Sequence, residues 1–160
     1  MTGWNRILVP TDFSDTSMAA VRQGVDLARN SGAELLLLYV IPEVATEFPI
    51  ELDAQVLEAE RDRVLALLAP SVRTAVRADV VVCQGAPAQE IVRCAEERDV
   101  DVIVMGTHGR GGVSHLILGS VAEQVIRMAP CPVLVVRNTA TPAGVAAEVA
   151  PSAVGAVLQA

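Results

Sequence analysis

Residues 102–120 read VIVMGTHGRGGVSHLILGS, and this stretch decides how the rest of the chain is organised. It begins with a short apolar, mostly β-branched run, which is typical of a buried strand. Five glycines follow within fourteen residues, at positions 106, 109, 111, 112 and 119, and no aromatic residue interrupts them. Glycine lets the backbone approach other groups closely, because it has no side chain. The pattern predicts a strand that runs into a glycine-rich loop.

A helix is predicted to begin where this loop ends. Ser120 and Glu123 form the S-x-x-E pattern of a capping box, in which two side chains accept hydrogen bonds from the first N–H groups of a helix. A helix N-terminus carries partial positive charge and free N–H groups, and both favour an anion. The loop therefore has the parts of a phosphate cradle. Its glycines are equally compatible with tight turns and close packing of strand against helix.

Length and charge narrow the possible functions. The chain has 160 residues, of which 52% are hydrophobic, and this suits a single globular domain. Its formal net charge is −7, which argues against a surface for nucleic acid or an anionic membrane. All twelve positively charged residues are arginines, so a phosphate-binding Walker A lysine is impossible.

The cysteines and the N-terminal segment indicate a cytoplasmic protein. Cys83, Cys94 and Cys131 are odd in number and widely spaced, which predicts reduced, buried thiols rather than disulfides or a zinc site. The first residues lack the basic and apolar regions of a signal peptide. No uninterrupted apolar run approaches the length of a membrane span. We therefore expect a soluble protein.

Strand-like and helix-like segments alternate along the chain. The expected strands cover residues 6–10, 34–41, 78–83, 101–106 and 132–137. The expected helices cover residues 15–30, 52–68, 87–98 and 120–129, and the second of these is the most polar. This alternation predicts a doubly wound α/β domain with a five-stranded parallel sheet and helices on both faces. Residues 1–138 form this domain, and residues 139–160 are expected to be an Ala-rich extension, disordered or weakly helical.

The predicted topology indicates where a ligand binds. Ligands of open α/β sheets bind beyond the carboxyl ends of the strands, where the strand order reverses. With the strand order 3-2-1-4-5, the reversal brings Pro10, Thr11 and Asp12 opposite residues 106–112. Val40 lies alongside, at the end of the second strand. Asp12 suits a ribose hydroxyl or a metal, and it suits a turn or cap before the first helix equally well.

Several enzyme motifs are missing. No G-x-G-x-x-G pattern follows the first strand, so the dinucleotide fingerprint is absent. Residues 112–116 approach the nucleophile elbow G-x-S-x-G but lack its last glycine. His108 and His115 are the only histidines, and they have no carboxylate pair nearby, which does not make a metal site. We interpret His108 as a phosphate or loop contact.

The glycine spacing is similar to that of the universal stress proteins, whose nucleotide-binding signature is G-x2-G-x9-G followed by Ser or Thr. Gly106, Gly109, Gly119 and Ser120 satisfy every spacing. Three flanking phrases also match, namely ILVPTDFS after residue 6, YVI at residues 39–41 and GSVAEQVIRMAPCPVLVVR at residues 119–137. The resemblance covers about residues 4–138.

The resemblance implies the ATP-binding branch of that family and a specific set of contacts. Asp12 would hold the ribose or the adenine edge, Val40 would offer backbone groups to the adenine, and Met105 and Gly106 would line its other side. His108, Gly109 and the amides of Gly119, Ser120 and Val121 would approach the phosphates, which Mg²⁺ or Mn²⁺ could bridge. The resemblance also implies a homodimer through the last strand, Val133–Val136. The full set of expected nucleotide-binding residues is Pro10, Thr11, Asp12, Val40, Met105, Gly106, His108, Gly109, Gly119, Ser120 and Val121.

The sequence thus favours an ATP-binding regulator of the stress response. It offers no convincing general base beside a γ-phosphate, so any hydrolysis is expected to be slow. Two alternatives stay open. One is a slow ATPase or nucleotidyl-transfer enzyme, and the other is an interaction dimer that makes no use of a nucleotide.

Overall fold

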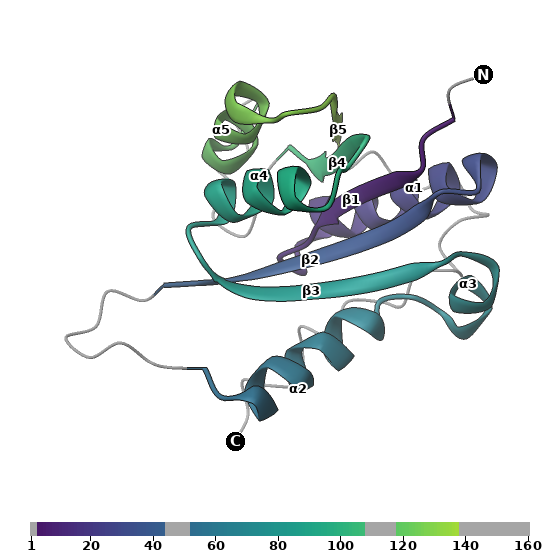
Figure 1. Cartoon of the computed structure of the whole chain (residues 1–160), viewed down its shortest axis with the longest axis horizontal. Coiled ribbons are helices and arrows are strands. Elements are labelled where there is room, and N and C mark those ends of the chain that lie inside the picture. Colours follow the sequence, from purple (N-terminus) through teal and green to yellow (C-terminus); the bar gives the residue numbers. More distant parts are fainter. Residues whose placement is uncertain (1–2, 44–51, 108–117, 138–160) are drawn as a thin grey trace.

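The computed structural model describes residues 3–43, 52–107 and 118–137. Its strands form one parallel sheet in the order β3-β2-β1-β4-β5, which confirms the predicted topology (Figure 1). The strands are β1 (Arg6–Pro10), β2 (Glu34–Pro42), β3 (Ala78–Gly85), β4 (Val102–Gly106) and β5 (Val133–Val136). The helices are α1 (Asp15–Ser31), α2 (Ala54–Leu65), α3 (Pro70–Ala75), α4 (Pro87–Glu97) and α5 (Ser120–Met128).

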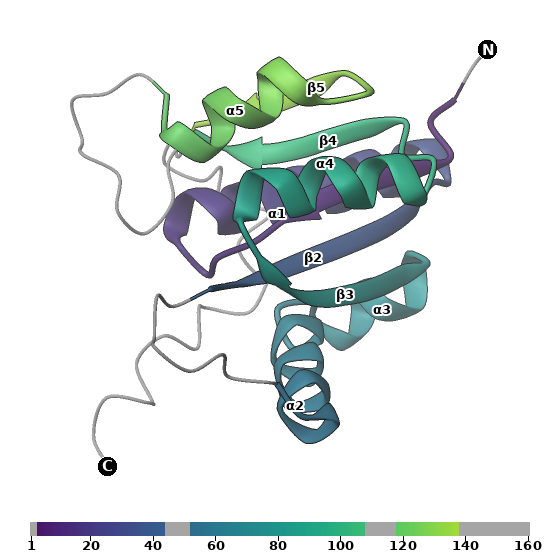
Figure 2. The same cartoon turned by 60° about the vertical axis from the view of Figure 1, so that its left-hand side comes forward.

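Helices cover both faces of the sheet, as the apolar strands require. Ile7 and Val9 point to a core shared with α1, α2 and α3, whereas Leu8 points to a core shared with α4 and α5. Figure 2 shows α1 and α4 on opposite sides of the strands. β2 lies inside the sheet, and its four consecutive leucines, residues 35–38, are each at most 1% exposed. A continuous apolar run is what a parallel strand covered on both faces needs.

Helix α1 follows directly from its sequence signals. Ser14 is its N-cap, and the Ser14 side chain accepts a hydrogen bond from the backbone N–H of Ser17. Gly32 ends the helix in the left-handed conformation at φ 72°, and its N–H donates to the carbonyl of Ala28. Its apolar residues Met18, Val21, Val25 and Ala28 recur at helical spacing and are buried. Helix α1 is therefore fixed at both ends and along one side.

The helix predicted over residues 52–68 is wrong in its extent. The structure divides this region into α2, which ends at Leu65, and α3, which begins at Pro70 and which the sequence analysis missed. Pro70 disfavours a helical backbone at the preceding residue, and it occupies the first turn of the new helix, where no N–H is needed. Leu67 and Leu68 turn into the core between the two helices. As predicted, α2 is largely exposed, and Val64 is its one buried residue.

Within the described ranges, no helix is long and apolar enough to cross a membrane. The expected extension at residues 139–160 lies outside the described residues. The domain boundary near residue 138 therefore stays a prediction.

Candidate functional site

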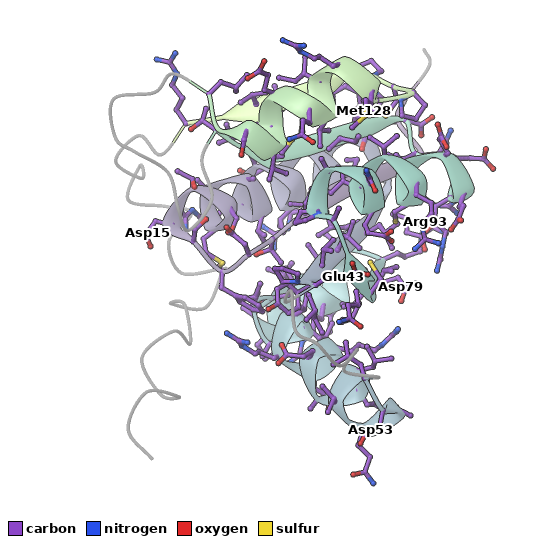
Figure 3. The ribbon with its side chains drawn as sticks, turned by 90° about the vertical axis from the view of Figure 1, so that its left-hand side faces the viewer. Asp15, Glu43, Asp53, Asp79, Arg93 and Met128 are labelled. Carbon is purple, nitrogen blue, oxygen red and sulfur yellow. The ribbon has the colours of Figure 1, made fainter. Side chains whose placement is uncertain are left out.

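The site predicted from topology lies at the edge where β1, β2 and β4 end. β1 pairs with β2 on one side and with β4 on the other, so the order reverses at β1 and β4. The pairing with β2 continues past the end of β1, because the N–H of Thr11 donates to the carbonyl of Leu38 at 2.8 Å. Figure 3 shows the side of the molecule that carries Asp15 at the start of α1 and Glu43 just after β2.

Asp12 forms a turn that leads into α1. Its Oδ1 accepts hydrogen bonds from the backbone N–H of Ser14 at 3.0 Å and from the Ser14 hydroxyl at 2.5 Å. The turn role left open by the sequence is therefore real, while the N-cap itself is Ser14. A carboxylate held by two donors has a fixed orientation. Asp12 is also half-buried, so the strand, the turn and the helix start form one rigid unit.

Two buried hydroxyl groups, those of Thr11 and Ser17, stabilise this turn. Thr11 is 5% exposed and Ser17 is 6% exposed, and their side-chain oxygens lie 3.2 Å apart. The Thr11 hydroxyl also accepts from the N–H of Phe13 at 3.2 Å, and the Ser17 hydroxyl donates to the carbonyl of Ser14 at 2.9 Å. Buried polar groups are costly unless they are paired, and these are paired with one another. The network fixes the path of residues 11–17.

Gly106 brings the end of β4 against the start of α1. A Cβ atom built on Gly106 would lie 2.8 Å from the backbone carbon and the carbonyl oxygen of Thr16. No side chain larger than hydrogen fits at that distance without movement. The packing role considered for the glycines therefore applies at Gly106. It also places the first glycine of the signature beside the turn of Asp12.

The two ends of the glycine-rich loop are tied together. The N–H of Gly119 donates to the carbonyl of Thr107 at 2.7 Å, and the N–H of Thr107 donates to the carbonyl of Val136 at 3.0 Å. Thr107 is 6% exposed, so this stem is anchored in the domain. Gly106 and Gly119, thirteen positions apart, are therefore held close to each other. His108 and Gly109 lie outside the described residues.

The capping box predicted at Ser120 is wrong. The N-cap of α5 is Gly119, which makes no side-chain cap, and Ser120 is the first helical residue. The N–H of Glu123 donates to the carbonyl of Gly119 at 2.9 Å, so Glu123 lies one turn into the helix. The helix itself begins at Ser120, as predicted, but its N-cap is Gly119 and not Ser120. The Ser120 residue is exposed, and Val121 packs partly against the core.

The remaining predicted residues line the same edge. Val40 and Met105 are 8% and 5% exposed, and they belong to the same apolar cluster, on the α4 and α5 side of the sheet. Pro10 is half-buried at the end of β1, opposite Leu38 of β2. Val40 and Met105 therefore lie on one side of the sheet edge, and the Asp12 turn follows the end of β1.

Three supporting residues were missed by the sequence analysis. Phe13 takes a left-handed backbone at φ 64°, Thr16 contacts Gly106, and Ser17 completes the hydroxyl pair. Only Ser17 carries a readable signal, because serine in the first turn of a helix often bonds to the backbone. Sequence spacing does not reveal the Phe13 conformation or the Thr16 contact.

The three cysteine thiols have raised pKa values, and Cys83 of β3 pairs with Val40 of β2. Burial raises the pKa of the Cys83 thiol to about 12, and the charge of Glu90 on α4 acts in the same direction. Burial also raises the pKa of Cys94 and of Cys131. All three cysteines are free, as predicted, although only Cys94 is fully buried. Among the described residues, no group of three or more acidic, His or Cys side chains is arranged to hold a metal ion.

The chain is similar to known proteins in both sequence and structure. A model of the universal stress protein family matches residues 3–137. A universal stress protein of Methanocaldococcus jannaschii is 38% identical over 141 residues, which cover 84% of this chain and 83% of that protein. The solved structure of the universal stress protein UspA from Lactobacillus plantarum is similar with a TM-score of 0.73 and 29% identity, covering 86% of this chain and all of that one.

Two further solved structures have the same fold and hold nucleotides. One is a universal stress protein in complex with cAMP, with a TM-score of 0.66, 24% identity and coverage of 86% of this chain and 100% of that chain. The other is the universal stress protein from Archaeoglobus fulgidus in complex with dAMP, with a TM-score of 0.59, 24% identity and coverage of 85% and 99%. At 24% identity, these two structures show that the fold is shared.

Proposed function

This chain belongs to the universal stress protein family, and we propose that it binds an adenine nucleotide, ATP, beyond the carboxyl ends of β1 and β4 in a regulatory role in the stress response. The observation that carries the proposal is the contact of Gly106 with the start of α1, beside the Asp12 turn. It joins the glycine signature to Asp12, an acidic side chain at the switch point of the sheet. The two nucleotide complexes of the same fold support the choice of adenine nucleotide.

The proposed contacts follow from the chemistry of these groups. Asp12 would accept hydrogen bonds from ribose hydroxyls, Val40 would offer backbone groups to the adenine, and Met105 and Gly106 would line its other side. The N-terminus of α5, with the amides of Ser120 and Val121, would face the phosphates, because helix N–H groups favour anions. Gly119 would lie beside the phosphates, while its own N–H donates to the carbonyl of Thr107. Pro10, Thr11, His108 and Gly109 complete the proposed set, and Mg²⁺ or Mn²⁺ would neutralise phosphate charge.

The nucleotide content of the purified protein tests this function directly. The protein is denatured, and the released small molecules are identified by chromatography and mass spectrometry. Near-stoichiometric ATP supports the proposal, and ADP indicates slow hydrolysis. An empty protein with no thermal shift in ATP and Mg²⁺, AMP or cAMP would contradict it and favour an interaction dimer that uses no nucleotide. Turnover above roughly one per second, the low end of ordinary enzymes, would favour an enzyme instead.

Asp12→Asn is expected to weaken ATP binding by at least about tenfold, since a hydrogen bond to a charged group contributes roughly 1.5–3 kcal/mol. The asparagine oxygen still accepts from the N–H of Ser14, so the fold should be retained. Asp15→Asn is the matched control, because it removes the same charge from an exposed position three residues later (Figure 3). Isothermal titration of both variants decides the question. Equal affinities for the two variants would remove Asp12 from the site.

We also propose a homodimer through β5. β5 is the last strand in the sheet order, and it pairs with β4 on one side. Leu134 on this strand is 39% exposed, and an apolar edge strand without a partner is an aggregation hazard. Leu134→Lys is therefore expected to convert a dimer into a monomer in sedimentation equilibrium. Val56→Lys, at a residue of α2 that is 41% exposed, should leave the mass unchanged. A dimeric Leu134→Lys variant would place the interface elsewhere.

A further inference from the structure

Phe13 has a backbone conformation that calls for an explanation. Its φ of 64° lies in the left-handed region, which bulky residues seldom adopt. The residue lies between Asp12 and the N-cap Ser14, so its conformation sets the direction of the turn. Strained backbone of this kind persists only where the surroundings hold it, and it gathers at functional sites.

Burial and two ring contacts hold the Phe13 side chain in place. The residue is 2% exposed, so it is part of the core. Its ring meets the ring of Tyr39 edge to face, with centroids 5.0 Å apart and planes at 70°. The Cζ atom of Arg63 lies 3.9 Å from the centroid of the Phe13 ring, which is a cation–π contact. A strand, a turn and a helix distant in sequence thus meet at one aromatic ring.

Arg63 is itself anchored. It lies in the last turn of α2, and its Nη1 donates to Glu60 Oε2 at 3.2 Å. Its side chain is 29% exposed, and the next residue, Val64, is fully buried. Figure 3 shows α2 projecting from the domain with Asp53 at its far end. The end of α2 that carries Arg63 is therefore the end that packs into the core.

We propose that Arg63 is a positioning residue for the nucleotide site. By lying on the ring of Phe13, its guanidinium holds the left-handed backbone that points Asp12 toward the ligand. The ligand part of this inference rests on the proposed function, whereas the structural part concerns the turn alone. A neutral residue at position 63 removes the attraction and allows the turn to leave its strained conformation. Helix α2 is thereby coupled to a site that it does not line.

Arg63→Met tests the proposal, because methionine keeps an extended apolar side chain and removes the charge. Its affinity for ATP, titrated well below its melting temperature, should be about five- to tenfold weaker, in line with a partly desolvated cation–π contact. Arg63→Lys keeps a cation and should restore most of this affinity. Arg61→Met is the matched control on the same helix, since Arg61 pairs with Asp79 at 2.9 Å rather than with Phe13. It should bind ATP as the original chain does.

A second measurement separates the turn from the ligand. Amide hydrogen exchange of Phe13 and Ser14 in the nucleotide-free protein should be faster in Arg63→Met and unchanged in Arg61→Met. If exchange is faster in Arg63→Met but the unsubstituted protein does not bind ATP, the proposed function is refuted and the positioning role stands. Unchanged exchange would overturn the positioning role, whether or not the affinity falls. Should Arg63→Met not fold, Glu60→Ala removes the acceptor that anchors the guanidinium, and it is measured in the same way.

Discussion

Leu37→Ala is expected to lower the free energy of unfolding by about 3–4 kcal/mol, within the range measured for leucine truncations in well-packed cores. Leu37 is fully buried in β2, where it pairs with Val9 of β1 and Val80 of β3. Its truncation therefore leaves a cavity at the centre of the sheet, on the side covered by α1. Neighbouring strands on both sides prevent the backbone from collapsing into that space. Urea denaturation followed by circular dichroism measures the change.

Val56→Ala provides the control for this measurement. It also shortens an apolar side chain, but Val56 is 41% exposed on α2. Exposed substitutions of this kind change stability by about 0.5 kcal/mol or less. A loss below about 1 kcal/mol for Leu37→Ala would mean that the core relaxes around the missing atoms, in contrast to the usual behaviour of buried leucines. The sheet would then be less tightly packed at β2 than the burial of its leucines indicates.

Gly106→Ala is expected to lower the free energy of unfolding by about 1–3 kcal/mol, as overpacking of a tight contact does. The added Cβ would lie 2.8 Å from the backbone carbonyl group of Thr16, and backbone cannot turn aside as the end of a flexible side chain can. The end of β4 must then move away from the start of α1. Because the proposed nucleotide site spans these two elements, ATP affinity should fall together with the stability. Thermal denaturation and titration with ATP measure the two effects.

Gly3→Ala is the matched control, since nothing lies within 4 Å of a Cβ built at that position. It should change neither stability nor ATP affinity. A stable Gly106→Ala protein would mean that the contact with Thr16 is looser in solution. A Gly106→Ala variant that kept its stability but no longer bound ATP would assign Gly106 to direct contact with the ligand. The substitution therefore separates the packing role of this glycine from its role in the signature.

The turn at Asp12 is held by residues from several elements of the domain. Gly106 of β4 packs against Thr16 at the start of α1, the Thr11 and Ser17 hydroxyls pair within the turn, and Arg63 of α2 contacts the ring of Phe13. A carboxylate fixed in this way loses little conformational entropy when a ligand binds, and such preorganisation favours affinity. In the proposed function, the rigid parts of the domain position Asp12 and the ends of the glycine-rich loop.

The sequence by itself determined the fold class and the strand order. Continuous apolar runs such as residues 35–38 specify strands buried on both faces, and alternation with amphipathic helices specifies a parallel sheet. The range predicted for α1 agrees with its caps, Ser14 and Gly32, because caps act within a few residues. The same kind of local signal, Pro70, marked the start of α3 and was overlooked.

Only the tertiary structure decided how the site is held. The contact between Arg63 and Phe13 joins residues fifty positions apart, and that between Gly106 and Thr16 joins residues ninety apart. The N-cap of α5 is also Gly119 and not the predicted Ser120, and the N–H of Gly119 donates to the carbonyl of Thr107 in the loop stem. Local patterns specify backbone conformation over a few residues. Contacts across the fold depend on the packing of whole elements, and this packing set the strained turn at Phe13.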